Sequence, residues 1–242
     1  MFALLSLAAG YNSLRDGPPD ALLSSIDCSS LVTPVDVSPV RSPQAVHTLL
    51  ARRFAGKDIL EIGTRNGDGM ACFAQTAHSA VAVEYEPRYC AILRKRAATL
   101  VEQGSGNFTV HCADYRKGLP AADVYTWWQQ EPDLADATLL HNLRLMKNLR
   151  KGAQAVLLFD TSWYADMGSW QKLQAEVSWF ERIKYNERAD CLSKDRPWGD
   201  ASNAPKDGPI QWGYTCKRAN GTFYVAGINL SPLAGLGDQL VD

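Results

Sequence analysis

The sequence predicts an α/β domain built on an open, mainly parallel sheet, with helices on both faces and an antiparallel hairpin at one edge. Between residues 42 and 185, short apolar runs alternate with segments whose apolar residues recur at helical spacing. Asn220 and Gly221 separate two further apolar runs near the C-terminus, which is a strong signal for a tight hairpin turn. Strands that alternate with helices are typical of parallel sheets with right-handed crossovers.

The chain divides into a lead-in over residues 1–41 and an α/β domain over residues 42–242. Several prolines interrupt the lead-in, where only a short helix after Asp20 is expected. Ser42 is a helix-capping residue and Pro43 suits the first helical position. The domain is therefore expected to open with a helix, which ends at Gly56.

The other expected elements of the domain follow in a regular order. Strands are predicted at residues 58–62, 80–84, 108–112, 124–128 and 155–159. Helices are predicted at residues 70–77, 87–104 and 135–150, followed by a helical stripe through Trp170, Leu173 and Val177. The run at 155–159 is apolar throughout, as expected for a strand buried on both faces. A sixth strand is expected near 180–185, a long loop at 190–209, and hairpin arms at 211–218 and 222–229.

The composition predicts a soluble globular protein. The 242 residues are 46% hydrophobic and 21% charged, with a net charge of −1, which is an ordinary balance for a folded domain. No long basic run indicates a nucleic-acid partner. The apolar residues 1–9 are far fewer than the roughly 20 needed to span a bilayer, so no membrane partner is expected. They lack the basic start of a signal peptide, although Ala8 and Ala9 leave that alternative open beside a short packed helix.

Six cysteines are present, and none forms a Cys-x-x-Cys pair, so neither a zinc site nor a redox motif is indicated. Cys72, Cys90 and Cys112 lie in apolar segments, where buried free thiols that behave as small hydrophobic groups are expected. Free thiols fit a reducing compartment, and the predicted location is the cytoplasm. A bridge between Cys191 and Cys216 is left open.

The segment from Ile59 to Gly69 is the leading candidate for a ligand site, because its glycines follow a strand and permit a tight turn and a close approach. A dinucleotide site needs Gly-x-Gly-x-x-Gly, but Arg65 replaces the second glycine and would obstruct a pyrophosphate. Glu61 adds a negative charge that repels phosphate and suits an ammonium group. S-adenosylmethionine (SAM) carries an ammonium and a sulfonium but no phosphate. Charge and sterics therefore favour SAM over NAD.

Two more carboxylates follow the next predicted strands. Glu84 ends the second strand, where an acid can accept hydrogen bonds from both hydroxyls of a ribose, and Tyr85 can contact the adenosine. Asp114 follows the third strand, where it can accept from the adenine amine, with Tyr115 stacking nearby. Ligands of open parallel sheets bind at the carboxyl ends of the strands, which is where these residues are expected to lie.

These segments resemble the class I SAM-dependent methyltransferases. The resemblance is carried by Ile59-Leu60-Glu61-Ile62-Gly63-x-x-x-Gly67, by Ala82-Val83-Glu84-Tyr85-Glu86-Pro87 and by Ala113-Asp114, and it covers residues 43–160. It implies a Rossmann-like, seven-stranded sheet with a reversed last strand. It also implies Glu61 and Gly63 near the methionine moiety, Glu84 on the ribose and Asp114 near the adenine. The predicted SAM site further includes Thr64, Arg65, Gly67, Tyr85 and Tyr115. The family often has a third glycine where this chain has Arg65.

The predicted activity is methyl transfer from SAM to a small molecule or a protein side chain, and the sequence does not identify this acceptor. Asp160, at the end of the fifth strand, is the candidate base or substrate-binding group. No carboxylate ends the fourth strand before Glu131, so no metal is expected. A non-catalytic, methyltransferase-like binding protein is the alternative, and an NAD(P)-dependent oxidoreductase is a third hypothesis. The four histidines, His47 among them, are predicted to be packed or exposed instead of catalytic.

Overall fold

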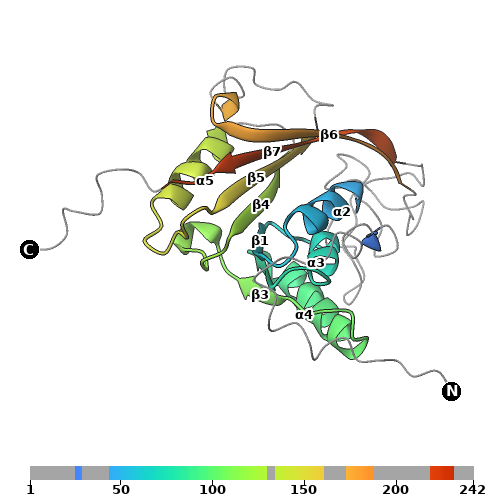
Figure 1. The fold of residues 1–242 in the computed structure, drawn as a ribbon. Helices are drawn as coiled ribbons and strands as arrows, with labels where there is room; N and C mark the ends of the chain where they lie inside the picture. Colours follow the sequence, from blue (N-terminus) through green and yellow to red (C-terminus); the bar gives the residue numbers. More distant parts are fainter. Residues whose placement is uncertain (1–24, 29–43, 130–133, 161–172, 188–218, 232–242) are drawn as a thin grey trace, which may run out of the picture.

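A seven-stranded sheet with the strand order β3-β2-β1-β4-β5-β7-β6 organises the fold. The computed structural model describes residues 25–28, 44–129, 134–160, 173–187 and 219–231 (Figure 1). Five strands run parallel, whereas β7 pairs antiparallel with both β5 and β6. The predicted fold class, a mainly parallel sheet with antiparallel strands at one edge, is confirmed.

The bounds of most elements agree with the sequence prediction within a few residues. The parallel strands are β1 (Asp58–Ile62), β2 (Ser79–Glu84), β3 (Thr109–Cys112), β4 (Val124–Gln129) and β5 (Gln154–Asp160). The antiparallel strands are β6 (Val177–Glu187) and β7 (Ala219–Asn229). The helices are α2 (Gln44–Arg53), α3 (Asp68–Phe73), α4 (Pro87–Glu102) and α5 (Leu134–Arg144), with a short 3-10 helix, η4 (Tyr115–Lys117).

Helices cover both faces of the sheet, with α2, α3 and α4 on one side and α5 on the other (Figure 1). The chain moves outward from β1 through β2 to β3, and then returns to the other side of β1 to form β4 and β5. Right-handed crossovers in opposite directions place the connecting helices on opposite faces. Successive side chains of β1 point to these opposite faces of the sheet. Ile59 packs into the core beneath α2, α3 and α4, and Leu60 packs into the core beneath α5.

The reversal of strand order lies between β1 and β4, which are parallel neighbours in the sheet. Helices leave the two strands on opposite faces at this point, and in open sheets of this type ligands bind at the carboxyl ends of the strands beside such a reversal. The turn that follows β1 and the end of β2 both lie at this edge, since Ile62 pairs with Val83. The topology therefore brings the predicted ligand segment to the expected edge of the sheet.

The predicted hairpin turn at Asn220 and Gly221 is wrong. Both residues lie inside β7, where Asn220 pairs with Asn186 and Gly221 pairs with Tyr185. The antiparallel partner of β7 is therefore β6, and the arm expected at 211–218 lies outside the described residues. Asn-Gly favours a tight turn only through its local backbone preference, and pairing with a long neighbouring strand overrides that preference here.

The prediction of free thiols at Cys72, Cys90 and Cys112 is also wrong, because each of these cysteines forms a disulfide bond. Cys28 is joined to Cys72 of α3, and Cys90 of α4 is joined to Cys112 of β3, with Cα atoms 5.5 and 5.8 Å apart. The partners are 44 and 22 residues apart, so proximity in the fold and not sequence spacing decides the pairing. The bonds remove the argument from free thiols on which the cytoplasmic prediction rested.

Among the helices in the described ranges, none is both long and apolar enough to cross a membrane. Several sequence predictions concern residues outside those ranges. These are most of the lead-in, the Ser42-Pro43 helix start, the loop at 190–209 and the bridge between Cys191 and Cys216.

Candidate functional site

A tight turn connects β1 to α3 and forms the floor of the candidate site. Gly63 and Gly67 both have left-handed backbone conformations, with φ of 72° and 81°. The amide of Gly63 donates to the Val83 carbonyl over 2.8 Å, and the Thr64 hydroxyl donates to the Glu61 carbonyl over 3.0 Å. A Cβ built on Gly63 meets no atom of the described residues within 4 Å, so the turn is open to a ligand at this point.

Arg65 also adopts a left-handed conformation, with φ of 52°, and no other non-glycine residue of the described ranges has a positive φ. Residues other than glycine rarely adopt this backbone conformation, because their Cβ atom crowds the following carbonyl oxygen. The guanidinium carbon of Arg65 lies 5.9 Å from the centre of the Tyr89 ring on α4. The backbone thus takes the shape of a glycine turn although a long cationic side chain is present.

Glu84 joins this turn to the end of β2. One of its carboxylate oxygens accepts from the Arg65 amide over 3.0 Å, and the other accepts from the Tyr85 and Glu86 amides over 2.8 and 3.0 Å. Glu84 is only 7% exposed, so these backbone donors replace much of the water that an ionised carboxylate would otherwise bind. Each carboxylate oxygen accepts up to two hydrogen bonds, and the oxygen facing Arg65 keeps capacity for another donor.

Arg96 of α4 fixes the second half of the turn. Its Nη1 donates to the Asn66 carbonyl over 2.8 Å and to the Asp68 carboxylate over 2.6 Å. Gly67 lies against the same helix, because a Cβ there would come within 2.6 Å of the Leu93 side chain. A cation on one element and a carboxylate on another therefore hold the turn in place before any ligand arrives. Arg96 lies thirty residues from this turn, and sequence reasoning missed it.

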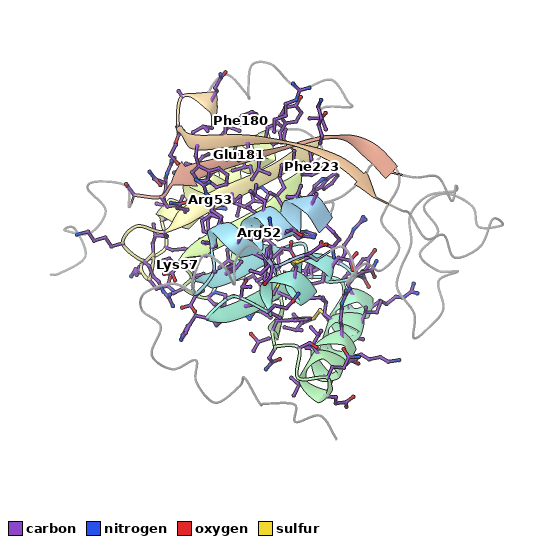
Figure 2. The ribbon with its side chains drawn as sticks, turned by 45° about the vertical axis from the view of Figure 1, so that its right-hand side comes forward. Arg52, Arg53, Lys57, Phe180, Glu181 and Phe223 are labelled. Carbon is purple, nitrogen blue, oxygen red and sulfur yellow. A yellow bond between two sulfur atoms is a disulfide. The ribbon has the colours of Figure 1, made fainter. Side chains whose placement is uncertain are left out.

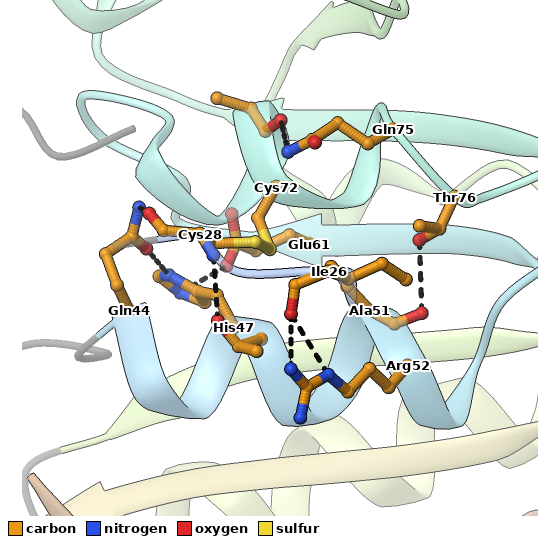
Figure 3. The surroundings of a disulfide bond; sticks show 12 residues. Ile26, Cys28, Gln44, His47, Ala51, Arg52, Glu61, Cys72, Gln75 and Thr76 are labelled. Atoms are coloured by element: carbon orange, nitrogen blue, oxygen red, sulfur yellow. Dashed lines mark hydrogen bonds and ion pairs between the residues drawn. A yellow bond between two sulfur atoms is a disulfide. The ribbon is translucent and has the colours of Figure 1, made fainter. Parts of the chain in front are cut away.

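Glu61, which is predicted near the methionine moiety of the cofactor, is buried beneath the first turn of α3. It is 6% exposed, and a Cβ added to Gly69 would lie 2.6 Å from its Oε1. Burial raises the pKa of Glu61 to about 8, with smaller contributions from the carboxylates of Asp68 and Glu84, while Arg96 acts in the opposite direction. The Nε2 atom of His47 lies 3.9 Å from Oε1 (Figure 3).

Asp114 lies beyond β3 at the same edge, since Cys112 pairs with Glu84. Its carboxylate caps the short helix η4 by accepting from the Arg116 amide, and it also forms two-pronged hydrogen bonds with the Arg116 guanidinium. The hydrogen bonds from Arg116 hold the pKa of Asp114 down at about 2. The predicted adenine-binding carboxylate is thus engaged in an ion pair, which sequence reasoning did not anticipate.

The remaining predicted residues are distributed around this edge. Tyr85 is 71% exposed and follows Glu84 directly, so its ring is accessible from solvent. Tyr115 begins η4 and packs partly against the α5 core. Asp160 ends β5, where its backbone pairs with Phe223 of β7, and the position of its side chain lies outside the description. Among the described residues, no group of three or more acidic, cysteine or histidine side chains is arranged to hold a metal ion.

Comparisons with known proteins identify the fold of the chain but not its activity. No protein-family model and no curated protein matches the sequence. A putative RNA methyltransferase from Pyrococcus horikoshii is 12% identical with a TM-score of 0.52, covering 89% of this chain and 96% of its own. A structure solved for the conversion of a disulfide bond into a thioacetal group during echinomycin biosynthesis is 12% identical with a TM-score of 0.55, covering 84% and 87%. A tRNA methyltransferase from Aquifex aeolicus is 16% identical with a TM-score of 0.51, covering 77% and 69%.

Proposed function

We propose that the protein binds SAM at the β1–β2 edge and transfers its methyl group to an acceptor that the chain does not identify. The observation that carries the proposal is the position of Glu84. Three backbone amides hold its carboxylate where two parallel strands end beside an open glycine turn. A carboxylate fixed at this place suits the paired hydroxyls of a ribose. The likeness in fold to solved methyltransferases supports the same conclusion.

The charges around the turn fit a cationic nucleoside better than a dinucleotide. Asp68 and Glu84 place two carboxylates beside the turn, and both disfavour a further negative charge at Glu61. The amide of Arg65, which a pyrophosphate would need as a donor, already donates to Glu84. These features disfavour a phosphate ligand and leave NAD(P) as the weaker candidate.

In this proposal the protein acts mainly by positioning. SAM supplies an activated methyl group, and transfer requires the acceptor to approach in line with the breaking carbon–sulfur bond. The residues around the turn hold the nucleoside end of the cofactor. Asp160, at the end of β5 and two strands from β1, is the candidate to orient the acceptor or to remove its proton.

A non-catalytic binding protein is the second candidate, and the state of Asp114 favours it. The carboxylate that the methyltransferase resemblance places near the adenine is engaged by the guanidinium and the amide of Arg116. An acid engaged in this way offers less acceptor capacity to an adenine amine. Such a protein would keep the methyltransferase-like fold, with SAM bound or not, and would not transfer a methyl group.

The test is a calorimetric titration with S-adenosylhomocysteine, comparing the wild type with Glu84→Gln. The amide has the shape of the carboxylate but lacks its charge and one acceptor. Affinity should therefore fall about tenfold or more, since a hydrogen bond to a charged group contributes roughly 1.5–3 kcal/mol. Glu86→Gln is the matched control, because Glu86 is exposed and caps α4 two residues away.

Each outcome separates the candidates. Equal affinity in the wild type and in Glu84→Gln would remove Glu84 from the binding site. Heat with NAD but none with S-adenosylhomocysteine would favour the oxidoreductase hypothesis. Tight binding of SAM without methyl transfer to any acceptor tested would favour the binding protein.

A further inference from the structure

His47 of α2 is buried and presents a nitrogen without a hydrogen-bond partner among the described residues toward Glu61. It is 2% exposed, and its Nδ1 lies 2.5 Å from the amide oxygen of Gln44. An amide oxygen only accepts, so Nδ1 carries the proton and a neutral ring offers Nε2 as an acceptor. Within the described ranges, Nε2 has no hydrogen-bond partner.

The group nearest to this nitrogen among the acidic side chains is the Glu61 carboxyl. Its Oε1 lies 3.9 Å from Nε2, and Figure 3 shows the two side chains approaching each other from α2 and β1. Gly69 keeps the space between them free, because a Cβ there would lie 2.6 Å from Oε1 and 2.9 Å from Nε2. Closing by about 1 Å would bring the two groups within hydrogen-bond distance.

The charged groups that influence Glu61 come from each neighbouring element. Asp68 of α3 and Glu84 of β2 disfavour a negative charge on Glu61, and Arg96 of α4 favours it. Arg96 also disfavours a positive charge on His47. On the remaining neighbour, β4, Thr126 pairs with Glu61, and its buried hydroxyl has no partner among the described residues. Among the described residues, neither Nε2 of His47 nor the Thr126 hydroxyl has a hydrogen-bond partner, so both are open to a partner.

We propose that His47 and Glu61 form a buried pair that holds one proton between the carboxyl group and Nε2, and that a cationic ligand displaces this proton to solvent. In the empty site the Glu61 O–H donates to Nε2, and His47 thereby positions the carboxyl. When an ammonium group arrives, the O–H bond breaks, the carboxylate pairs with the ammonium and the proton passes to water. This second step rests on the function proposed above, whereas the pair itself does not.

The ionisation of the two groups agrees with this arrangement. Burial lowers the pKa of His47 to about 3, and Arg96 acts in the same direction. Burial also raises the pKa of Glu61 to about 8. Between these values the pair carries one proton and no net charge, which is the state that a buried site tolerates best.

The pair is tested without ligand by nitrogen NMR of histidine-labelled protein between pH 5 and pH 9. His47 is assigned by its absence in His47→Phe, which keeps an aromatic ring against Phe73. At pH 6 we expect a neutral ring with its proton on Nδ1 and with Nε2 accepting a hydrogen bond. The Nε2 signal should then shift as Glu61 loses its proton, and Glu61→Gln should abolish that shift. His78→Phe, at an exposed histidine, is the control that should leave the His47 signals unchanged.

Two results would overturn the pair. One is a His47 ring that is charged at pH 6 or carries its proton on Nε2. The other is a pH-dependent shift of Nε2 that persists unaltered in Glu61→Gln. Neither measurement requires that the protein bind SAM.

The coupling to ligand is tested by calorimetry with S-adenosylhomocysteine at pH 6.5, in buffers that differ in their heat of ionisation. We expect release of about one proton for each ligand bound by the wild type and none by Glu61→Gln. Binding by the wild type without proton release would overturn the coupling and leave the proposed function intact. Absence of binding would refute the proposed function together with the coupling, while the NMR titration would still decide the pair.

Discussion

Arg65 shows how one residue can meet a backbone requirement that glycine usually meets. Its φ of 52° follows from its place in the turn between Gly63 and Gly67. The Glu84 carboxylate accepts from its amide and so helps to hold this conformation. The sequence predicted a site at this turn, but it could not show that the backbone keeps the glycine geometry despite the side chain.

Replacing Arg65 with glycine should therefore stabilise the turn relative to replacing it with alanine. Both changes remove the guanidinium, but only glycine relieves the crowding at positive φ, which costs an alanine about 1 kcal/mol. The measurement is the free energy of unfolding of Arg65→Gly and Arg65→Ala in urea. Equal stability of the two variants would mean that the left-handed conformation is not retained at this position.

Glu61 and His47 also predict how stability depends on pH. With a pKa of about 8 in the folded state against 4.5, Glu61 holds its proton more tightly when folded, so stability falls as pH rises from 4.5 to 8. With a pKa of about 3 against 6.5, His47 has the opposite effect between those values. Above pH 6.5 only the Glu61 effect remains of the two.

The free energy of unfolding should accordingly decline between pH 6.5 and pH 8, by up to about 1.4 kcal/mol per pH unit for one proton. Glu61→Gln should flatten this decline, and Glu86→Gln should not. The measurement is urea unfolding at several pH values. A wild-type stability that stays constant over this range would contradict the burial of an acid with a raised pKa.

Strand β6 shows why the periodicity of a sequence cannot by itself predict which strand forms the edge of a sheet. Trp179 of β6 lies across Gly227 of β7, and its indole nitrogen donates to the Gln154 side chain of β5 over 3.2 Å. On the same strand, Glu181 lies 3.9 Å from Arg53 of α2, and Figure 2 shows these two side chains between the helix and the strand. The edge is thus specified by contacts among distant segments, which no local pattern records.

The contact between Trp179 and Gly227 predicts that even a small substitution at Gly227 will lower the free energy of unfolding. In Gly227→Ala the added methyl group would overlap the indole, with atoms as close as 1.9 Å, so the ring must move. Overpacking of this kind costs typically 1–3 kcal/mol in the free energy of unfolding. In a Trp179→Ala background the same change should cost much less, and a urea double-mutant cycle measures the difference. Equal costs in both backgrounds would show that the ring does not lie over Gly227.

For the molecule as a whole, the sequence predicted most strands and helices well, but it did not predict the contacts between residues that are far apart in the chain. The alternation of elements predicted the mainly parallel sheet, and Glu84 ends the strand next to β1 as predicted. The contact of Arg96 with the turn and the approach of His47 to Glu61 were not predicted, because the direction of these side chains depends on how helices pack. The cysteine pairs were missed for the same reason, since residues far apart in sequence meet only in the folded chain.

The two disulfides should contribute substantially to global stability. Replacing Cys28 and Cys72 by alanine removes a cross-link between residues 44 apart, which should lower the free energy of unfolding by about 2–4 kcal/mol. Replacing Cys90 and Cys112 tests the second link in the same way. Urea unfolding of the non-reduced protein measures both, and mass spectrometry before and after alkylation verifies the bonds. Free thiols at all four positions would contradict the pairing.

The bond between Cys28 and Cys72 also affects how the protein should be handled at the bench. The carbonyl of Cys28 accepts from the Gln44 side chain, and the oxygen of that same side chain holds the His47 ring (Figure 3). Breaking the bond would therefore loosen contacts that lead, through Gln44 and His47, to the acid beneath the ligand turn. Affinities are therefore best measured on protein in which the bond between Cys28 and Cys72 has been verified, since that form has the arrangement of residues described above.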